Sequence, residues 1–287
     1  MQDTTDSCLF THTLTTEQSN LGKGFATSIQ GARHVRDNTV CQDASIYCLY
    51  NDTICFGVAD GHGDHKHALS HIGSRLALDV AIPILYSVLD SISGEGLTHL
   101  PTQLKHSIEK RIRWEWNLGC KKHLGISSSD GSWIPELVQF GTTLLMCCQN
   151  NTHSLFFQLG DGDIALMNAD DTVSFIFDED QDVTGTVTHS LCRPFEEDIS
   201  QICVQPNRPS NRMILLSTDG IRDCLQGDRE RFATILPWLV KKSNEPIEAT
   251  QQWLYKISNS GNGDDISLAI HTPYLAQTDG ESTNGNA

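Results

Sequence analysis

Apolar and polar positions along the chain follow two spacings, one typical of helices and one typical of strands. Between Lys66 and Ser93 the apolar residues recur every three or four positions, which predicts a helix that Pro83 interrupts or kinks. The same spacing from about Pro101 to Lys122 predicts a second helix. Short apolar runs predict strands at 46–50, 54–59, 141–148, 154–159, 164–168, 173–177 and 213–217.

The last part of the chain combines two helices with a final strand. Helical spacing covers 229–242 and 246–260, and the run 266–271 predicts the strand. Between Asp178 and Ser200 the sequence is acidic without apolar periodicity, so we predict a long surface excursion. This order of elements favours an α+β fold with mostly antiparallel sheet. We expect one domain over residues 21–273, after a partly disordered extension (1–20) and before a disordered tail (274–287).

Composition and charge narrow the functional classes. The 287 residues are 38% hydrophobic, enough for a sizeable core, and their net charge is −16. This negative charge argues against nucleic acid as a partner, because phosphate binding needs clustered cations. We find no signal peptide and no apolar run near the roughly 18 residues of a membrane helix, so we expect a cytoplasmic chain with no membrane partner. Its ten cysteines are scattered without a CxxC pair and should mostly be free thiols in the core.

Four acidic segments share one design, in which an apolar run meets an aspartate beside a glycine. They contain Asp60-Gly61, Asp161-Gly162, Asp219-Gly220 and Gly263-Asp264. If these strands are neighbours in a sheet, their carboxylates converge, and like charges that close require a cation between them. Oxygen ligands alone select Mg²⁺ or Mn²⁺ over zinc. Because paired hard cations most often serve phosphoester hydrolysis, the pattern predicts a metal-dependent phosphatase.

Six short motifs, in this order, resemble the metal-dependent PP2C-type serine/threonine protein phosphatases. The motifs are Cys41-Gln42-Asp43-Ala44, Asp60-Gly61-His62-Gly63, Phe140-Gly141-Thr142-Thr143, Leu159-Gly160-Asp161, Ser217-Thr218-Asp219-Gly220-Ile221-Arg222-Asp223 and Asp264-Asp265-Ile266-Ser267. The resemblance runs from about Gly22 to His271, and Gly31-Ala32-Arg33-His34 is similar to a bacterial-type branch. It implies a β-sandwich of two antiparallel sheets flanked by helices on both sides, in four layers α/β/β/α, with a two-metal site at one end.

The resemblance also implies a set of metal ligands. Asp60 would bridge two Mn²⁺ or Mg²⁺ ions, and the carbonyl of Gly61 would bind one of them. Asp219 and Asp264 would bind the other ion, and Asp161 with Asp219 would correspond to a third, weaker site. Asp60 and Asp219 are thus catalytic residues in this interpretation. A metal-bridged hydroxide would hydrolyse phosphoserine and phosphothreonine without a phosphoenzyme.

Other site residues follow from the same resemblance. His62 occupies the place of the proposed general acid. Gln42 stands where many members carry a glutamate, and Asp43 would act through a bound water. Asp163 replaces the arginine of the common Asp-Ser-Arg. Near the expected position of the phosphate-binding arginine the sequence leaves three candidates, Arg33, His34 and Arg36.

The excursion that begins at Asp178 lies where that family carries a flap beside the cleft. Its tip is small and rich in hydrogen-bonding groups, and the flap residues that we name are Thr184, Gly185, Thr186 and His189. We expect this loop to cover the cleft and to contact the phosphopeptide. An acidic stem should favour basic residues around the phosphorylated one, and it consists of Asp178, Glu179, Asp180 and Asp182.

The predicted function is dephosphorylation of proteins by a monomer that reverses a serine/threonine kinase. One alternative is a pseudophosphatase-like binding module, which Gln42 favours. The retained Asp60, Asp219 and Asp264 disfavour it. Another is a haloacid-dehalogenase-like phosphatase, whose last acidic motif resembles 160–163 but whose Asp-x-Asp nucleophile is missing after the first strand. A cysteine phosphatase is excluded, because no cysteine is followed by arginine six residues later.

Overall fold

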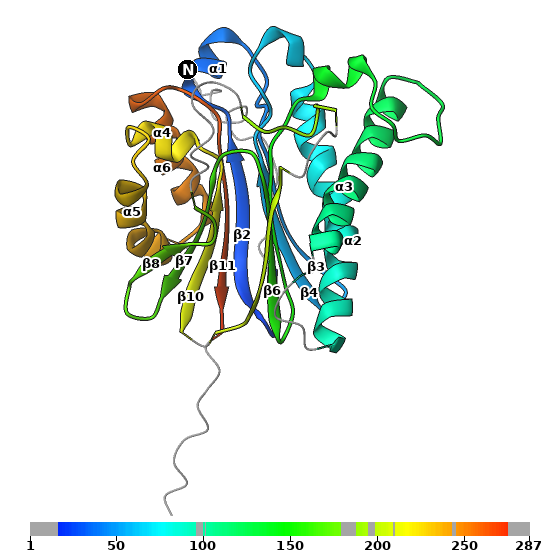
Figure 1. Cartoon of the computed structure of the whole chain (residues 1–287). Helices are drawn as coiled ribbons and strands as arrows, with labels where there is room; N and C mark the ends of the chain where they lie inside the picture. Colours follow the sequence, from blue (N-terminus) through cyan, green and yellow to red (C-terminus); the bar gives the residue numbers. More distant parts are fainter. Residues whose placement is uncertain are drawn as a thin grey trace, which may run out of the picture.

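Two antiparallel sheets form the centre of the molecule. The computed structural model describes residues 17–95, 100, 102–178, 188–194, 199–208, 210–242 and 245–274. One sheet has the strand order β1-β2-β11-β10-β7-β8, and the other has the order β3-β4-β5-β6-β9. The sheets lie face to face with helices on both outer sides (Figure 1). The predicted four-layer sandwich is confirmed.

The strands agree with the sequence prediction to within three residues wherever one was predicted. The six-stranded sheet contains β1 (Glu17–Ser19), β2 (Gly22–Ile29), β7 (Asp163–Asn168), β8 (Val173–Phe175), β10 (Asn211–Ser217) and β11 (Ile266–Pro273). The five-stranded sheet contains β3 (Ala44–Tyr50), β4 (Thr53–Ala59), β5 (Leu144–Gln149), β6 (His153–Leu159) and β9 (Gln201–Pro206). The sequence did not predict β1, β2 or β9. The first of these lies inside the stretch 1–20 that was assigned to an extension, and residues 1–16 and 275–287 are outside the described part.

Two long helices cover one sheet and two shorter ones cover the other. The first pair is α2 (Ser70–Glu95) and α3 (Thr102–His123), beside the five-stranded sheet, and the second pair is α5 (Arg229–Lys242) and α6 (Ile247–Ser260). Short elements are α1 (Ala32–Asp37), α4 (Gly220–Cys224) and the 3₁₀ turns His65–His67 and Pro135–Phe140. Of the two outcomes predicted at Pro83, an interruption or a kink, the interruption is wrong, because α2 continues through the proline. Burial of Ile82 and Ile84 beside the proline outweighs the lost backbone hydrogen bond.

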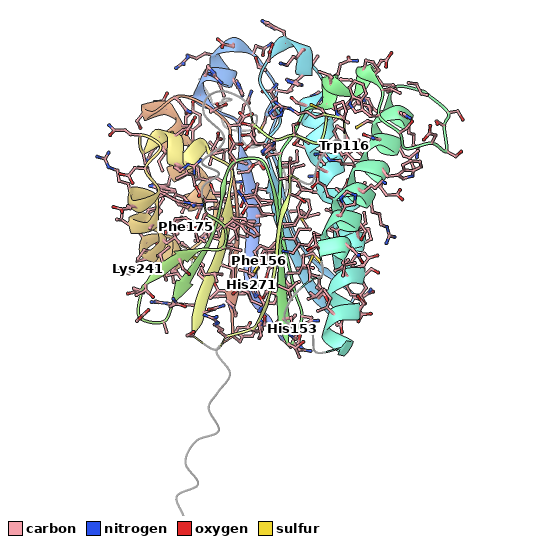
Figure 2. All side chains as sticks on the ribbon, in the orientation of Figure 1. Trp116, His153, Phe156, Phe175, Lys241 and His271 are labelled. Atoms are coloured by element: carbon pink, nitrogen blue, oxygen red, sulfur yellow. The ribbon has the colours of Figure 1, made fainter. Side chains whose placement is uncertain are left out.

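The apolar core has three parts, one on each outer face and one between the sheets. In Figure 2, Phe156 and His271 lie between the sheets, whereas Trp116 belongs to α3. The nine described cysteines are free, and six of them are buried. Within the described part of the chain, the prediction of mostly buried free thiols is therefore confirmed.

Helix α2 is more apolar than the sequence analysis allowed. The stretch Ser70–Ile92 has a mean hydropathy of 1.5 and is long enough to cross a membrane. The statement that no run reaches this length is therefore wrong on length and composition. In the fold, 56% of this stretch is buried, and it packs against α3 and strands β3, β4 and β5. Packing inside the protein accounts for its apolar character.

The excursion from 178 to 200 is not all surface. Ser190, Leu191 and Cys192 are 1%, 1% and 4% exposed, so these three residues are packed into the fold. The Nε1 of Trp133 donates a hydrogen bond to the Cys192 carbonyl at 2.8 Å. Apolar periodicity did not reveal this segment, because it is held through its backbone rather than through one apolar face.

Candidate metal centre

Five aspartates from different strand ends lie at one end of the sandwich. Strands β3 and β4 are antiparallel neighbours, so Asp43 just before β3 lies beside Asp60 just after β4. Asp219 follows β10, and Asp264 precedes its antiparallel neighbour β11. Asp161 precedes β7, which pairs with β10 on its other edge. The acidic motifs of the sequence therefore meet in space.

Burial and mutual repulsion dominate the electrostatics of these carboxyls. Burial, followed by the charges of Asp43 and Asp219, raises the pKa of Asp60 well above its usual value. Burial, followed by Asp161, raises the pKa of Asp219 to about 7, while a hydrogen bond with Asp60 opposes this rise. Burial also raises the pKa of Asp43, and Asp264 adds to the effect. Among the described ion pairs, none joins Asp43, Asp60 or Asp219 to a lysine or arginine.

This donor set fits a hard divalent cation. Carboxylate oxygens are the ligands that Mg²⁺ and Mn²⁺ prefer, and a cation would relieve the repulsion. Across the described residues, no group of three or more His, Cys, Asp or Glu side chains is arranged to hold a metal ion. A bound cation would therefore have to bring the carboxylates closer together. The backbone of Gly61 also lies close to the backbone of Gln42. A Cβ there would lie 2.4 Å from the Gln42 carbonyl oxygen, so this approach requires glycine.

Threonine side chains fix two of the aspartates. Thr142 Oγ1 and Thr143 N each donate to the Asp60 carbonyl oxygen at 2.9 Å, and Asp60 N donates to Thr143 Oγ1 at 2.9 Å. Thr218 Oγ1 donates to Asp43 Oδ2 at 2.9 Å. The motifs that contain these threonines supported the family resemblance, but the sequence did not assign them a role. Their role is to hold the backbone of Asp60 and the side chain of Asp43.

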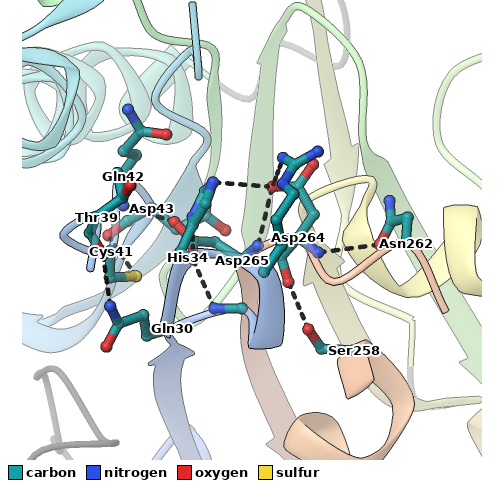
Figure 3. A network of polar contacts seen from close by, with 12 residues as sticks. Gln30, His34, Thr39, Cys41, Gln42, Asp43, Ser258, Asn262, Asp264 and Asp265 are labelled. Carbon is teal, nitrogen blue, oxygen red and sulfur yellow. Dashed lines mark hydrogen bonds and ion pairs between the residues drawn. The ribbon is translucent and has the colours of Figure 1, made fainter. Parts of the chain in front are cut away.

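Asp265 joins three parts of the site although the sequence analysis gave it no role (Figure 3). Its Oδ1 accepts from Gly31 N at 2.7 Å and lies 2.8 Å from His34 Nδ1. Its Oδ2 accepts from Gln42 N at 2.6 Å. These contacts connect α1 and the start of β3 to the start of β11. The only signal in the sequence was its position next to Asp264.

The three candidates for phosphate binding have different surroundings. His34 is buried, and its hydrogen bond to Asp265 raises the pKa of the ring. Arg33 is 46% exposed, and its Nη2 lies 3.2 Å from Asp264 Oδ1. Arg36 is exposed on the last turn of α1. Arg33 therefore combines an accessible guanidinium with contact to the carboxylates, whereas His34 already serves the network around Asp265.

His62 lies directly after the Asp60-Gly61 turn. Its backbone N donates to the Gly141 carbonyl at 3.0 Å, and its ring meets that of His67 edge to face, with centroids 4.9 Å apart. Burial, followed by the positive field of His67 and of Arg193, lowers the pKa of His62 to about 4. The ring is therefore neutral near pH 7, and an anion bound beside it would raise this pKa.

Two departures from the family pattern have distinct structural consequences. Gln42 is buried, its Nε2 donates to the His62 carbonyl at 3.3 Å, and within the described residues no hydrogen bond reaches its Oε1. Asp163 is fully buried but does not join the converging carboxylates. Instead its Oδ1 lies 2.8 Å from Arg229 Nε and 3.4 Å from Arg222 Nη1.

The predicted flap is only partly within the described residues. Thr184, Gly185 and Thr186 lie outside them, as do Glu179, Asp180 and Asp182 of the acidic stem. His189 is half-buried, and its neighbour Thr188 donates from Oγ1 to Asp161 Oδ2 at 2.9 Å. The described end of the excursion thus reaches one of the five aspartates.

Comparison with known proteins gives a family and a fold. The sequence matches the family described as Protein phosphatase 2C over residues 30–257. No curated protein matches the chain. A serine-threonine phosphatase 2C from Toxoplasma gondii has a similar structure, with 14% identity, a TM-score of 0.60, and coverage of 92% of this chain and 98% of that one.

Two further solved structures carry metal ions. The catalytic domain of the serine/threonine protein phosphatase PstP, in complex with two manganese ions, has 14% identity and a TM-score of 0.54, covering 88% of this chain and 98% of its own. RsbX in complex with magnesium has 12% identity and a TM-score of 0.53, covering 91% and 100%. At these identities the structures establish the shared fold.

Proposed function

Because this chain belongs to the protein phosphatase 2C family, we propose that it hydrolyses phosphoserine and phosphothreonine in proteins with the help of Mn²⁺ or Mg²⁺. Membership makes the chain a protein phosphatase, that is, a hydrolase of phosphoric monoesters. It also excludes the haloacid-dehalogenase alternative, whose nucleophile the chain lacks. The similar structures that contain manganese and magnesium support the choice of metal.

The observation that carries this proposal is the group of converging carboxylates, in which Asp43, Asp60 and Asp219 form no ion pair with a lysine or arginine among the described residues. Asp60, the Gly61 carbonyl and Asp219 would hold two ions together with Asp264, and Asp161 would contribute to a third site. Asp43 would contribute through a water. Such ions, when bound, lower the pKa of water and stabilise the charge that develops on a phosphoryl group. A group of like charges is poorly suited to any purely structural role.

The surrounding residues can position the phosphoester. Arg33 is the candidate that can reach both the carboxylates and an incoming phosphate, because its guanidinium is exposed and lies 3.2 Å from Asp264. His62 would donate a proton to the departing seryl or threonyl oxygen, after the phosphate dianion has raised its pKa. Gln42 would hold the loop that carries His62 through its bond to the His62 carbonyl.

We also propose that the protein is a monomer in the cytoplasm and that it opposes a serine/threonine kinase. The net charge of −16 supports basic rather than acidic protein surfaces as partners. Gel filtration coupled to light scattering would test the monomer, and cell fractionation would test the location.

The test of the proposed function is hydrolysis with and without metal. We expect Mn²⁺-dependent release of phosphate from p-nitrophenyl phosphate and from phosphothreonine peptides, and loss of both with EDTA. Asp171→Asn serves as the control, because Asp171 pairs only with Arg212 on the surface among the described contacts. EDTA-resistant turnover or a trapped phosphoenzyme would refute the mechanism. Mn²⁺ binding without hydrolysis of any substrate would favour the pseudophosphatase alternative.

A further inference from the structure

Helix α3 carries a buried ion pair that the proposed mechanism does not use. Glu109 and Arg113 are one turn apart, their side chains are 0% and 4% exposed, and Arg113 Nε donates to Glu109 Oε1 at 2.9 Å. They share the inner face of the helix with Trp116, which is also buried. Removing two charges from water costs several kcal/mol for each ion, so such a pair persists only where further hydrogen bonds compensate.

The further hydrogen bonds that the described residues show go to the part of the excursion at 188–194 and 199–200. Arg113 Nη1 donates to the carbonyl oxygens of Ser190 at 3.1 Å, Leu191 at 3.0 Å and Arg193 at 3.2 Å. Glu109 Oε2 accepts from the backbone N of Ile199 at 3.2 Å and of Ser200 at 2.9 Å. The arginine thus holds the start of this segment and the glutamate holds its end.

The segment held in this way contacts the carboxylate site at two points. Ser190 Oγ accepts from Thr142 N and donates to Thr142 O, both at 3.1 Å, and Leu191 N donates to the same carbonyl at 3.0 Å. Thr142 in turn donates to the Asp60 carbonyl. Two residues before Ser190, Thr188 donates to Asp161. A series of hydrogen bonds therefore leads from Arg113 through Ser190 and Thr142 to the Asp60 carbonyl, and the backbone from Ser190 back to Thr188 extends the connection to Asp161.

We propose that Glu109 and Arg113 are positioning residues for the metal centre, which they serve by fixing residues 188–194 and 199–200, the first of which contact Thr142 and Asp161. The inference rests on the proposed function, since it concerns the cation site of that reaction. Neither residue touches the reacting atoms. Their effect passes through the backbone that they hold, in the same way that outer groups around metal ligands set ligand orientation.

A matched control lies on the same helix. Lys121 is 4% exposed, and its Nζ donates to the Asp130 carbonyl at 2.7 Å. Like Arg113, this α3 residue therefore holds a loop through a backbone carbonyl. Its loop, however, has no described contact with the aspartates. Comparing Arg113→Met with Lys121→Met separates a general loss of anchoring from a loss of positioning at the site. Arg113→Lys and Glu109→Gln are milder variants in case Arg113→Met fails to fold.

The experiment measures Mn²⁺ binding by the electron paramagnetic resonance signal of the free ion, and hydrogen exchange of the metal-free protein. We expect Arg113→Met to weaken Mn²⁺ binding about tenfold, with Glu109→Gln and Arg113→Lys in between. The amides of Leu191 and Thr142 should exchange faster in the same variants. Lys121→Met should change neither quantity, and phosphatase kcat should fall with Mn²⁺ affinity in the Arg113 and Glu109 variants.

Unchanged Mn²⁺ affinity in folded Arg113 and Glu109 variants would overturn the proposal, even if the amides of segment 188–200 exchange faster, because the pair would then be structural only. Equal weakening by Lys121→Met would overturn it as well. A wild-type chain that binds Mn²⁺ but hydrolyses no phosphoester refutes the proposed function alone. A wild-type chain that binds no Mn²⁺ refutes both.

Discussion

Two groups of carboxylates among the described residues differ in their partners, and only one of them is paired with two arginines. At the start of β7, Asp163 is fully buried between Arg222 and Arg229, and Arg229 also stacks on an aromatic ring. At the end of the sandwich, Asp60 and Asp219 are surrounded by other carboxyls instead. The two settings meet where β7 pairs with β10, and they differ chiefly in the partners of their carboxylates.

The difference separates charge that serves the fold from charge that serves a ligand. A buried pair with good geometry roughly offsets its own desolvation, and removing one member leaves the other unpaired. A group of like charges destabilises the folded chain until a cation or a proton arrives. Violations of local stability rules are expected at functional sites. This contrast leads to predictions in which mutations in the two settings have opposite effects.

The largest expected effect comes from neutralising the unpaired carboxylates. Asp60→Asn and Asp219→Asn should each lower kcat/KM by at least about 10³-fold, because bound ions supply several kcal/mol of charge stabilisation. In EDTA the same variants should be more stable than the wild type, because each removes a like charge from the group. Steady-state kinetics with Mn²⁺ and urea unfolding in EDTA would measure the two effects.

Asp163→Asn is the counterpart in the paired setting. It should cost about 3 kcal/mol of stability by removing the charge that pairs with Arg222 and Arg229, while kcat/KM of the folded fraction changes by only a few-fold. The comparison fails if Asp60→Asn destabilises the metal-free chain as much as Asp163→Asn does.

A smaller effect is expected at His62, where burial, followed by cationic neighbours, lowers the pKa. His62→Gln should slow phosphopeptide hydrolysis by about 10²-fold or more, because serine and threonine are poor leaving groups that need a proton. Hydrolysis of p-nitrophenyl phosphate should fall much less, since its leaving group departs without one. A comparison of kcat for the two substrates tests this, and equal losses would make His62 a structural residue.

The sequence predicted the strands and the aspartates for the same reason. Both depend on local patterns, which are the alternation of apolar runs and the aspartate-glycine pairs at their ends. The convergence of Asp60, Asp161, Asp219 and Asp264 followed from assuming that their strands are neighbours in one sheet. The registers confirm this for β7, β10 and β11, whereas Asp60 follows β4 of the other sheet and meets the remaining aspartates across the sandwich. Strand β2 was missed because its two faces are both mostly buried, so it does not alternate.

The rest of the site depends on contacts between distant residues. Asp265 looked like a repeat of Asp264, yet it accepts hydrogen bonds from Gly31 and Gln42, more than 200 positions away. Glu109 and Arg113 looked like an ordinary charged pair at helical spacing, which is usually solvated. Only the fold shows that they are buried against the backbone of segment 188–200.

Metal binding should stabilise the protein only through the converging aspartates at the end of the sandwich. Mn²⁺ at one hundred times its Kd should add about 2.7 kcal/mol to the free energy of unfolding of the wild type. Asp163→Asn should gain the same increment from its lower baseline, whereas Asp219→Asn should gain little. Urea unfolding with Mn²⁺ and with EDTA would show this. An equal gain in Asp219→Asn would place the stabilising ion elsewhere.

The smallest expected effect concerns His271, a buried group that is neutral rather than paired. It lies between the sheets, its Nδ1 is 2.8 Å from the Tyr47 hydroxyl, and burial lowers its pKa to about 3. Below the unfolded value of about 6.5, the unfolded chain binds a proton that the folded chain excludes. Stability from this residue is therefore complete above pH 6.5 and is lost as the pH falls, by at most about 1.4 kcal/mol per pH unit.

His271→Gln can still contact Tyr47 but does not titrate. In EDTA, urea unfolding from pH 7.5 to 4.5 should show the wild type losing stability relative to this variant only in the acidic range. The carboxylates are common to both proteins and cancel in the difference, so a difference that stays constant with pH would contradict the depressed pKa of His271.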